Sequence, residues 1–538
     1  MNPPHYTFRP VIIDRHTAAR AYFLSVLAML LLESVARLSA YYPPSLLTKG
    51  HAPSRRATNH TLPRIYLHKL LTLPSPLPFL TSHTVLSLLR CALFTALNIL
   101  FGWNRIRYST DYQLYGWLAL ANGGLALLLP TRTNLFSVVA RIPAPTLLMY
   151  HRWAGVAAVV HASLHFGLTA QQYVQTHQFG IVAENARIRV GIMAWAALAL
   201  MFITSLRVVR RRAFEVFCFV HFAFLVFAAG ALYHASHAVE FLVPGLVLWG
   251  VDRAVRLYYA FGRGVAVLEV VHCPGGVTKL RLEGLETTRA GQMVWVQIPG
   301  VSTVNWHPFT VASAPGERGT VAIRGLGGYT RKVQQRLEGA TGPNKEAPRV
   351  ACGEGMKIRI DGPYGVESLR WARYPVVALV AGGIGITPAV SIASSIVNEA
   401  ARGGLVVAGE RRHVHLLWCI GAIAHAGWFE DELKGLAALA STEHSPVSLE
   451  ISIHVTGTGS EREEQEVENS KYEGPGEVHR GRPDVASWFQ HIKTVHPGCD
   501  VAVDLCGPRS LVDDGRRAAV DASSKGGLFF VQEEIFEL

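Results

Sequence analysis

MYHRWAGVAAVVHASLHFG, residues 149–167, is apolar enough to cross a bilayer and yet carries three histidines. An imidazole buried in lipid is costly unless it meets a partner, so histidines in such a segment indicate a functional site. His151 and His165 are 14 positions apart. In an α-helix this spacing leaves them within about 40° of one face and roughly 21 Å apart along the axis. The stretch therefore predicts a membrane helix with two histidines stacked along one side.

A second apolar stretch, FEVFCFVHFAFLVFAAGALYHA at residues 214–235, carries His221 and His234. Their spacing turns His234 about 140° away from the face of His221 in a regular helix. A π-bulge, with Gly230 as the weak point, is expected to correct part of this turn. Two parallel helices with histidines at matching depths can hold two stacked haems, each iron ligated from both sides. His161 and His237 are interpreted as packed or hydrogen-bonded side chains.

The composition indicates a membrane protein with a soluble half. Half of the 538 residues are hydrophobic and only 17% are charged, against about 25% in an ordinary soluble domain. The lipid-like runs end near Tyr259. The net charge is +12, and the basic residues cluster beside these runs, as in RVVRRR at 207–212. This placement indicates that they determine the membrane topology and predicts no nucleic-acid partner. The seven cysteines form no C-x-x-C pair, so neither a zinc site nor a disulfide framework is indicated.

Seven apolar segments are predicted to span the bilayer, and no cleavable signal peptide is expected before them. Loops 39–83, 131–146 and 207–212 hold more Lys and Arg than the other loops, so they are placed at the cytosol and the N-terminal tail outside. His151 and His221 then lie near the inner leaflet, and His165 and His234 near the outer one. Glu33 in the first segment leaves open that this segment packs inside the bundle. The segments are 18–38, 84–102, 113–130, 147–168, 188–206, 213–235 and 238–258.

Residues 264–370 show short β-type runs between Gly and Pro turns, which predicts a small antiparallel barrel. Three motifs follow one another: HPFT at 307–310 with Ser313, GGYTR at 327–331, and DGPYG at 361–365. HPFT is explained equally well by a ligand-binding segment and by a Pro-containing turn between strands. Glycines let a backbone approach a pyrophosphate, while the Thr330 hydroxyl and Arg331 offer donors to it.

A buried strand, a glycine-rich turn and a helix start are predicted at YPVVALVAGGIGITP, residues 374–388. The N–H groups at a helix start favour a pyrophosphate, although the turn lacks the G-x-G-x-x-G pattern. Further strands at 413–420, 449–455 and 501–505 predict a parallel sheet. The last strand leads into Cys506-Gly-Pro508, where a buried structural cysteine is the alternative to a functional one. Residues 457–480 are interpreted as a disordered insertion.

These motifs, in this order, resemble the ferric reductase and NADPH oxidase superfamily, and the span count and soluble tail resemble its fungal metalloreductases. The resemblance implies two b-type haems, the inner held by His151 with His221 and the outer by His165 with His234. It also implies FAD on the barrel, with the HPFT segment along the flavin ring. The FAD residues implied are His307, Pro308, Phe309, Thr310, Ser313, Arg324, Gly328, Thr330, Arg331 and Gly362.

The resemblance further implies a nicotinamide nucleotide, with Cys506 beside the nicotinamide as the catalytic residue. The implied contacts are Gly382, Gly383, Gly385, Thr387, Pro388, Arg482, Cys506, Gly507 and Pro508. Two departures are visible. Gly421 stands where many relatives carry an Arg suited to a 2′-phosphate, so NADPH is preferred through Arg482, with NADH as the alternative. Leu538 takes the place of a terminal aromatic that covers the flavin.

The expected architecture is a membrane helical bundle (18–260) after an outside tail (1–17), then an FAD barrel (264–370) and an α/β NAD(P)H domain of ferredoxin reductase type (374–538). The expected function is NADPH-driven reduction of ferric or cupric chelates across the plasma membrane, or across an internal membrane as the alternative. The nucleotide domains are placed in the cytosol. A superoxide-generating oxidase and a redox-silent scaffold are the rival functions. An iron-uptake partner and a homo-oligomer are left open.

Overall fold

We describe the protein from a computed structural model in two compact units, one of residues 1–40 and 88–255, the other of 41–87 and 256–537. The residues that the structure describes are 14–41, 61–73, 84–103, 112–132, 134–178, 180–262, 264–302, 305–325, 327–340, 349–351, 357–367, 369–402, 411–442, 445–457 and 472–534.

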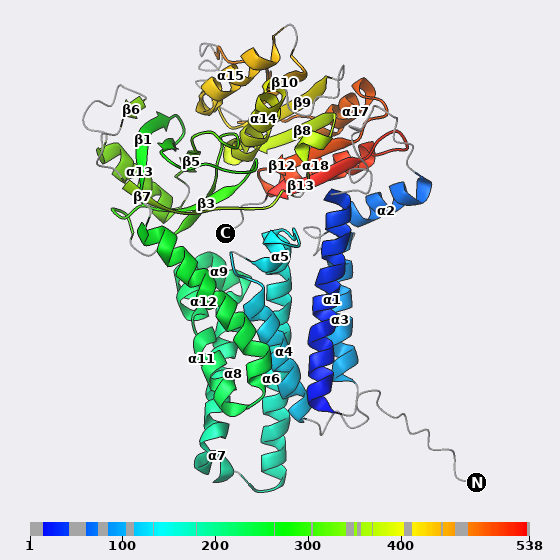
Figure 1. The fold of residues 1–538 in the computed structure, drawn as a ribbon, viewed down its shortest axis with the longest axis vertical. Coiled ribbons are helices and arrows are strands. Elements are labelled where there is room, and N and C mark those ends of the chain that lie inside the picture. The colour runs from blue at the N-terminus through cyan, green and yellow to red at the C-terminus, as the bar shows by residue number, and fades with distance from the viewer. Residues whose placement is uncertain are drawn as a thin grey trace. The chain divides into compact units, whose positions relative to one another are not determined.

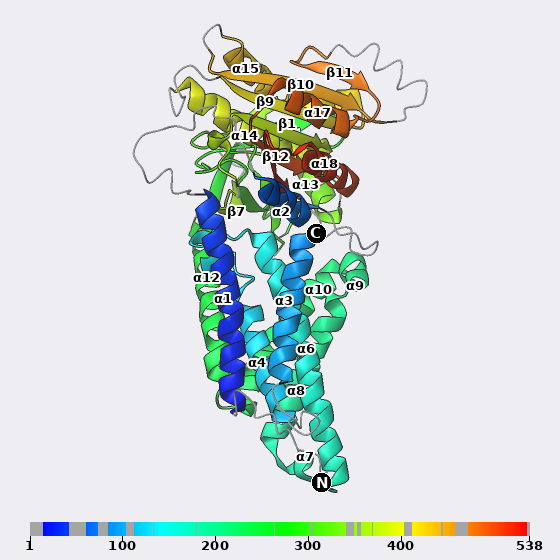
Figure 2. The ribbon, with the colours of Figure 1, turned by 90° about the vertical axis from the view of Figure 1, so that its right-hand side faces the viewer.

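The first unit is a bundle of helices, and each of the predicted apolar segments is mainly helical within its described residues (Figures 1 and 2). By length and apolarity, α1, α3, α6, α8 and the α10–α11 pair qualify as membrane spans among the described residues. The segment at α4 is shorter, and α12 contains Pro244. The helices are α1 (Arg15–Tyr41), α3 (Val85–Gly102), α4 (Tyr112–Leu128), α5 (Leu135–Val138), α6 (Ala144–Gln175), α7 (Gly180–Glu184), α8 (Ala186–Ser205), α9 (Arg207–Arg212), α10 (Phe214–His221), α11 (Phe224–His234) and α12 (Ala238–Gly262).

The sixth apolar segment is interrupted at Phe222 and Ala223, between α10 and α11. Both residues have ψ near −10°, and their N–H groups donate to carbonyls three residues back, as does Leu225. Such bonds belong to the tighter 3₁₀-helix, which turns by about 120° per residue instead of 100°. The expected π-bulge near Gly230 is therefore wrong. The overwound residues rotate His234 back toward the face of His221. A π-bulge would unwind the helix and rotate His234 in the opposite direction.

Polar side chains join the helices inside the bundle. Glu33 on α1 accepts hydrogen bonds from Arg37 and from Arg90 on α3, at 2.9 and 2.6 Å. Deeper in the bundle, Asn98 donates to the Tyr22 hydroxyl at 2.9 Å, and His161 Nε2 hydrogen-bonds to Asn98 Oδ1 at 3.1 Å. Helix α1 thus packs by its polar groups against the bundle, and His161 has the hydrogen-bonded role expected of it.

The second unit begins its main part with an antiparallel sheet in the order β4-β3-β7-β1-β2-β5, with β6 paired to β1. The runs expected to be strands form β1, β2, β3 and β5, and HPFT is itself β4. Helix α13 (Gly328–Ala340) begins within the GGYTR motif. The strands are β1 (Gly264–Cys273), β2 (Val277–Leu282), β3 (Met293–Gln297), β4 (His307–Thr310), β5 (Thr320–Arg324), β6 (Arg349–Ala351) and β7 (Lys357–Tyr364).

A parallel sheet in the order β11-β10-β9-β8-β12-β13 follows. From β8 the chain moves outward to β9, β10 and β11, then returns to the other side of β8 with β12 and β13 (Figure 1). The order reverses between β8 and β12, and ligands of such sheets bind at the carboxyl ends of the strands at this switch point. The elements are β8 (Val376–Gly382), α14 (Ile386–Ala401), β9 (Arg412–Ile420), α15 (Glu430–Ala440), β10 (Val447–Val455), β11 (Glu477–Arg480), α17 (Val485–Val495), β12 (Val501–Cys506), α18 (Arg509–Ala522) and β13 (Phe529–Glu534).

Two segments differ from expectation. The end of the insertion predicted to be disordered is the edge strand β11, paired in parallel with β10. All four of its residues are exposed, so no hydrophobic alternation marked it as a strand. The loop predicted at 39–83 contains α2 (Leu62–Thr72), where His68 hydrogen-bonds to the Phe529 carbonyl at 3.0 Å.

Candidate haem and nucleotide sites

The structure brings the four predicted haem histidines together in two facing pairs. The ring centres of His151 and His221 are 6.0 Å apart, and those of His165 and His234 are 6.1 Å apart. Two imidazoles on opposite sides of one metal ion, with bonds of about 2.0–2.1 Å each, place their ring centres roughly 6.3 Å apart. Each pair therefore has the spacing that a shared iron requires.

Three of these histidines use the other ring nitrogen to donate to a main-chain carbonyl. His151 Nδ1 bonds to Ala126 O at 2.7 Å, His165 Nδ1 to Tyr112 O at 2.7 Å, and His234 Nδ1 to Arg187 O at 2.8 Å. Because a carbonyl can only accept, the proton is assigned to Nδ1 and the Nε2 lone pair stays free. Metal-ligating histidines nearly always have this arrangement. The buried Nδ1 of His221 has no hydrogen-bond partner within the described residues.

A proline and two glycines position three of these rings. This role was not predicted from the sequence. In a continuing helix the Ala126 carbonyl would accept from the N–H of residue 130, but that residue is Pro130, which has none. Gly116 and Gly191 each lie four residues after the carbonyl that accepts from His165 or His234, on the same helix face. A Cβ at Gly116 would lie 3.2 Å from His165 Nδ1, and one at Gly191 would lie 2.6 Å from His234 Nδ1.

We expect Gly191→Ala to expel His234 from its position, because the added methyl group overlaps the ring. The haem content of the purified protein should fall by about half, since contacts around a ligating histidine control metal affinity. Gly250→Ala on α12 is the matched control, because α12 carries none of the four histidines and no atom lies within 4 Å of the added Cβ. Full haem content in Gly191→Ala would contradict this role for the glycine.

The predicted FAD residues line one part of the antiparallel sheet and the start of α13. The His307 ring stacks on Tyr329 with centres 4.0 Å apart and planes 18° apart, and burial lowers the pKa of His307. The buried Thr310 Oγ1 has no partner within the described residues, as expected of a group that awaits a ligand. Gly328 and Thr330 lie in the first turn of α13, where free N–H groups favour a pyrophosphate.

The remaining FAD residues have structural contacts as well. Ser313 Oγ accepts a hydrogen bond from the Thr320 N–H at 3.2 Å. Gly362 has φ +132°, a conformation that side chains disfavour. Arg324 lies over the Trp428 ring at 5.5 Å, and its guanidinium would be 3.3 Å from a Cβ at Gly383. Arg324 therefore borders the nucleotide turn as well as the flavin barrel. Its guanidinium could bind a phosphate of either FAD or the nicotinamide nucleotide.

The two predicted nucleotide motifs meet at the switch point of the parallel sheet. A Cβ at Gly382 would lie 2.5 Å from Pro508 Cδ, and one at Gly385 would lie 2.5 Å from the Cys506 carbonyl oxygen. Gly383 has φ +55°. The glycines thus let the turn after β8 lie directly on the turn after β12, and α14 begins there with Thr387 and Pro388 buried in its first turn.

The other expected nucleotide residues have different surroundings. Cys506 is 1% exposed, and burial together with the charge of Glu534 raises the pKa of its thiol, so it is protonated at neutral pH. Arg482 is exposed, two residues beyond the end of β11. That position is three strands from β8, or roughly 14 Å across the sheet at its carboxyl edge. Leu538 lies outside the described residues.

Asp504 is a further buried acid that the sequence did not single out. It is 0% exposed, and neither carboxylate oxygen has a partner within the described residues. Burial, and then the charge of Glu534, raises the pKa of Asp504, while burial raises the pKa of Glu534 to about 7. Because the pKa of Asp504 is higher in the folded than in the unfolded protein, its contribution to the free energy of unfolding is fully present below the unfolded pKa near 3.8. That contribution is lost as pH rises toward the folded pKa.

We therefore expect Asp504→Asn to stabilise the nucleotide domain most at pH 8, less at pH 5, and little near pH 4. An unsatisfied buried polar group costs about 1–3 kcal/mol, and the neutral amide removes the added cost of charge. The temperature at which the full-length protein releases FAD, followed by flavin fluorescence, reports this difference. Equal shifts at all three pH values would contradict the protonation argument.

Comparison with known proteins agrees with this layout in three consecutive segments. The family described as ferric reductase like transmembrane component matches residues 115–232, an FAD-binding domain matches 263–368, and the ferric reductase NAD binding domain matches 374–520. These define a membrane protein with FAD- and NAD-binding domains. The chain belongs to the superfamily of ferric reductases and NADPH oxidases.

Relatives from both branches of the superfamily are similar to the chain. Ferric reduction oxidase 7, chloroplastic, of Arabidopsis thaliana is 31% identical over 61% of this chain and 45% of its own length. Human dual oxidase 2 is 26% identical over 70% of this chain and 27% of its own. The chain thus spans less than half the length of either. A ferredoxin NADP+ reductase from Neisseria gonorrhoeae aligns with 50% of this chain and 98% of its own length, at 16% identity and a TM-score of 0.33.

Proposed function

We propose that the protein is a transmembrane metalloreductase that carries electrons from NADPH, through FAD and two b-type haems, to ferric or cupric chelates across the membrane. The observation that carries this proposal is the pair of facing histidine couples, at 6.0 and 6.1 Å, in helices that can span a bilayer. The bound cofactors supply the redox chemistry: hydride acceptance by the flavin and one-electron transfer by iron.

The chain's own residues would bind and orient these groups. His151 with His221, and His165 with His234, would ligate the irons, with the tautomer of three of them set by main-chain carbonyls. The start of α13 would hold the FAD pyrophosphate, and the turn after β8 that of NADPH. Cys506, as a neutral thiol, would pack beside the nicotinamide, and Arg482 would meet the 2′-phosphate. The basic loops support a cytosolic position for the nucleotide domains, with the plasma membrane as the expected membrane.

An optical spectrum of the purified full-length protein, with haem and flavin quantified, tests this function. We expect two haems and one FAD for each chain, and a bis-imidazole haem spectrum that becomes reduced when NADPH is added. A haem spectrum that NADPH leaves unchanged would favour the redox-silent scaffold instead.

Superoxide production is the second candidate, since dual oxidase 2 and human NADPH oxidase 3 are among the relatives. Assays with and without chelated iron separate the two functions. Reduction of ferric chelate that persists under argon supports the reductase, whereas NADPH consumption that requires dioxygen and yields superoxide supports the oxidase.

A further inference from the structure

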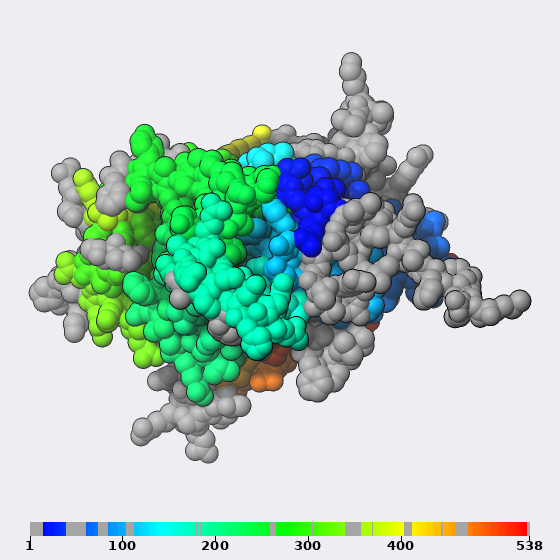
Figure 3. Space-filling view, turned by 90° about the horizontal axis from the view of Figure 1, so that it is seen from below, coloured from blue at the N-terminus to red at the C-terminus, as the bar shows by residue number. Residues whose placement is uncertain are grey.

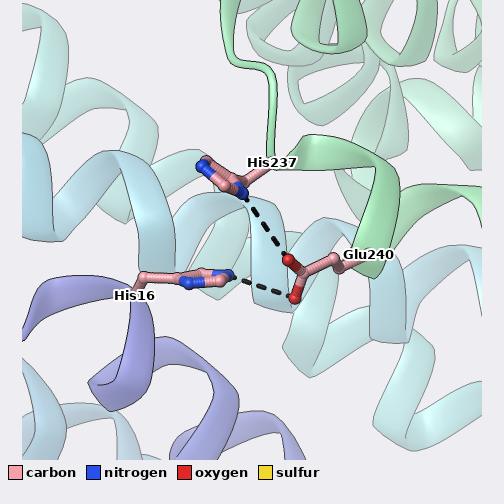
Figure 4. A group of neighbouring side chains, drawn as sticks. All are labelled: His16, His237 and Glu240. Atoms are coloured by element: carbon pink, nitrogen blue, oxygen red, sulfur yellow. Dashed lines mark hydrogen bonds and ion pairs between the residues drawn. The ribbon is translucent and has the colours of Figure 1, made fainter.

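Three side chains of types that can bind a metal ion meet at the end of the helical unit where α1 and α12 begin. His16 Nε2 is 3.1 Å from Glu240 Oε2, and His237 Nδ1 is 3.6 Å from Glu240 Oε1. One donor atom from each residue lies within 4.8 Å of the other two. Figure 4 shows the two imidazoles beside one another, each directed at one oxygen of the Glu240 carboxylate. No sequence pattern indicated this group, because His16 and His237 are more than 200 residues apart.

The donor set indicates which ligand would bind. Two imidazoles and one carboxylate suit first-row transition ions and leave coordination positions open, and Cu²⁺ binds such sites most tightly of the divalent ions. The group is accessible: His237 and Glu240 are exposed and His16 is half-buried. In Figure 3, which views this end of the molecule, the blue surface of α1 adjoins the green surface of α12. An ion could therefore enter from solvent.

The cluster is close to the outer haem ligands along the chain. His237 follows His234 by three residues, so their Cα atoms are at most about 11 Å apart even in a fully extended chain. The Trp117 ring fills the space beside the cluster, with its centre 4.7 Å from that of His16 and 5.6 Å from that of His237. An ion bound here would lie near the group that His165 and His234 hold.

We propose that His16, His237 and Glu240 form an acceptor site, where a cupric or ferric ion binds and is reduced by one electron. This inference rests on the proposed function, which supplies the electron. The step balances without a proton or a bond to the protein: Cu²⁺ gains one electron and becomes Cu⁺, or Fe³⁺ becomes Fe²⁺. Cu⁺ prefers softer thiolate and thioether ligands, so the reduced ion binds these residues less tightly and is released.

Arg20 provides the contrasting explanation of the cluster. Its guanidinium bonds to Glu240 Oε2 at 2.7 Å, so the carboxylate could serve only to join α1 to α12. The two roles differ in what removal of Arg20 does. If the residues bind a metal ion, Arg20→Ala frees a carboxylate oxygen and increases the affinity for Cu²⁺. If the cluster is only an ion pair, the protein does not bind Cu²⁺ here, and Arg20→Ala leaves Cu²⁺ binding unchanged.

The test measures Cu²⁺ binding to the oxidised full-length protein in detergent by calorimetry, with electron paramagnetic resonance to detect nitrogen ligands. We expect one nitrogen-ligated Cu²⁺ site. Its affinity for Cu²⁺ should fall at least tenfold in His16→Ala and in His237→Ala, since loss of a residue that only supports a metal ligand can already cost tenfold. His177→Asn is the matched control, an exposed histidine beyond the end of α6 whose φ of +54° asparagine tolerates.

The haem spectrum and its reduction by NADPH should be unchanged in these variants, while the KM for Cu²⁺ rises. Cu²⁺ binding that the His16→Ala/His237→Ala double variant retains would overturn the site, as would an equal loss in His177→Asn. The binding measurement needs no electron transfer. A protein that binds Cu²⁺ in this way but whose haems NADPH does not reduce would therefore count against the proposed function and not against the site.

Discussion

Replacing His165 by alanine is expected to remove the outer haem and abolish electron transfer across the membrane. The His165 ring faces His234 at 6.1 Å and is held by the Tyr112 carbonyl, so its loss leaves one ligand at that level. Flavin reduction by NADPH should continue at the wild-type rate, because the nucleotide motifs are unchanged. Haem quantification and stopped-flow measurement of flavin and haem reduction separate the two effects.

His161→Gln is the control for this prediction. His161 lies four residues away on α6, is buried, and hydrogen-bonds to Asn98 without facing a second imidazole. A glutamine amide can maintain that hydrogen bond, so the variant should retain both haems and full transfer. Unchanged transfer in His165→Ala, or equal losses in the two variants, would exclude His165 as an iron ligand.

Replacing Gly385 by alanine is expected to slow flavin reduction by NADPH by about 100-fold, the cost of a displacement near 1 Å at a reacting centre. The new Cβ would lie 2.5 Å from the Cys506 carbonyl oxygen and 3.0 Å from its sulfur. Neither neighbour can move freely, since the carbonyl is main chain and Cys506 ends a buried strand. The turn after β8 would therefore separate from the turn after β12.

Chemical reduction of the haems by dithionite should be normal in Gly385→Ala, and FAD content should be unchanged, which places the defect at the nucleotide. Gly435→Ala provides the control within the same domain. Gly435 lies in α15 with no atom within 4 Å of its added Cβ, and alanine in a helix is favourable. A wild-type rate of flavin reduction in Gly385→Ala would show that the two turns need not touch.

The sequence predicted the helices and most strands because each follows from a local pattern, whereas the histidine pairs were predicted from matching depths in two helices and from the family resemblance. Apolar runs define helices, and alternation with turn residues defines β1, β2 and β3. The orientation of His234 did not follow, since periodicity assumes one helical geometry throughout. The overwinding at Phe222 and Ala223 depends on packing that no local pattern records.

Other features of the sites depend on contacts between distant residues. Gly191 and His234 meet across α8 and α11, and His16 meets Glu240 across α1 and α12. Neither contact leaves a signal in the spacing of residues along one element. Cys506 could be located from its motif, but its burial follows from the sheet around it.

The overwound residues between α10 and α11 have a consequence for how this segment can change during evolution. Three bonds that reach back three residues provide the rotation that aligns His234 with His165. The rotation also depends on the number of residues between the two histidines. A single inserted or deleted residue would swing His234 by about 100° around the helix. We therefore expect functional relatives of this protein to keep a constant number of residues between His221 and His234.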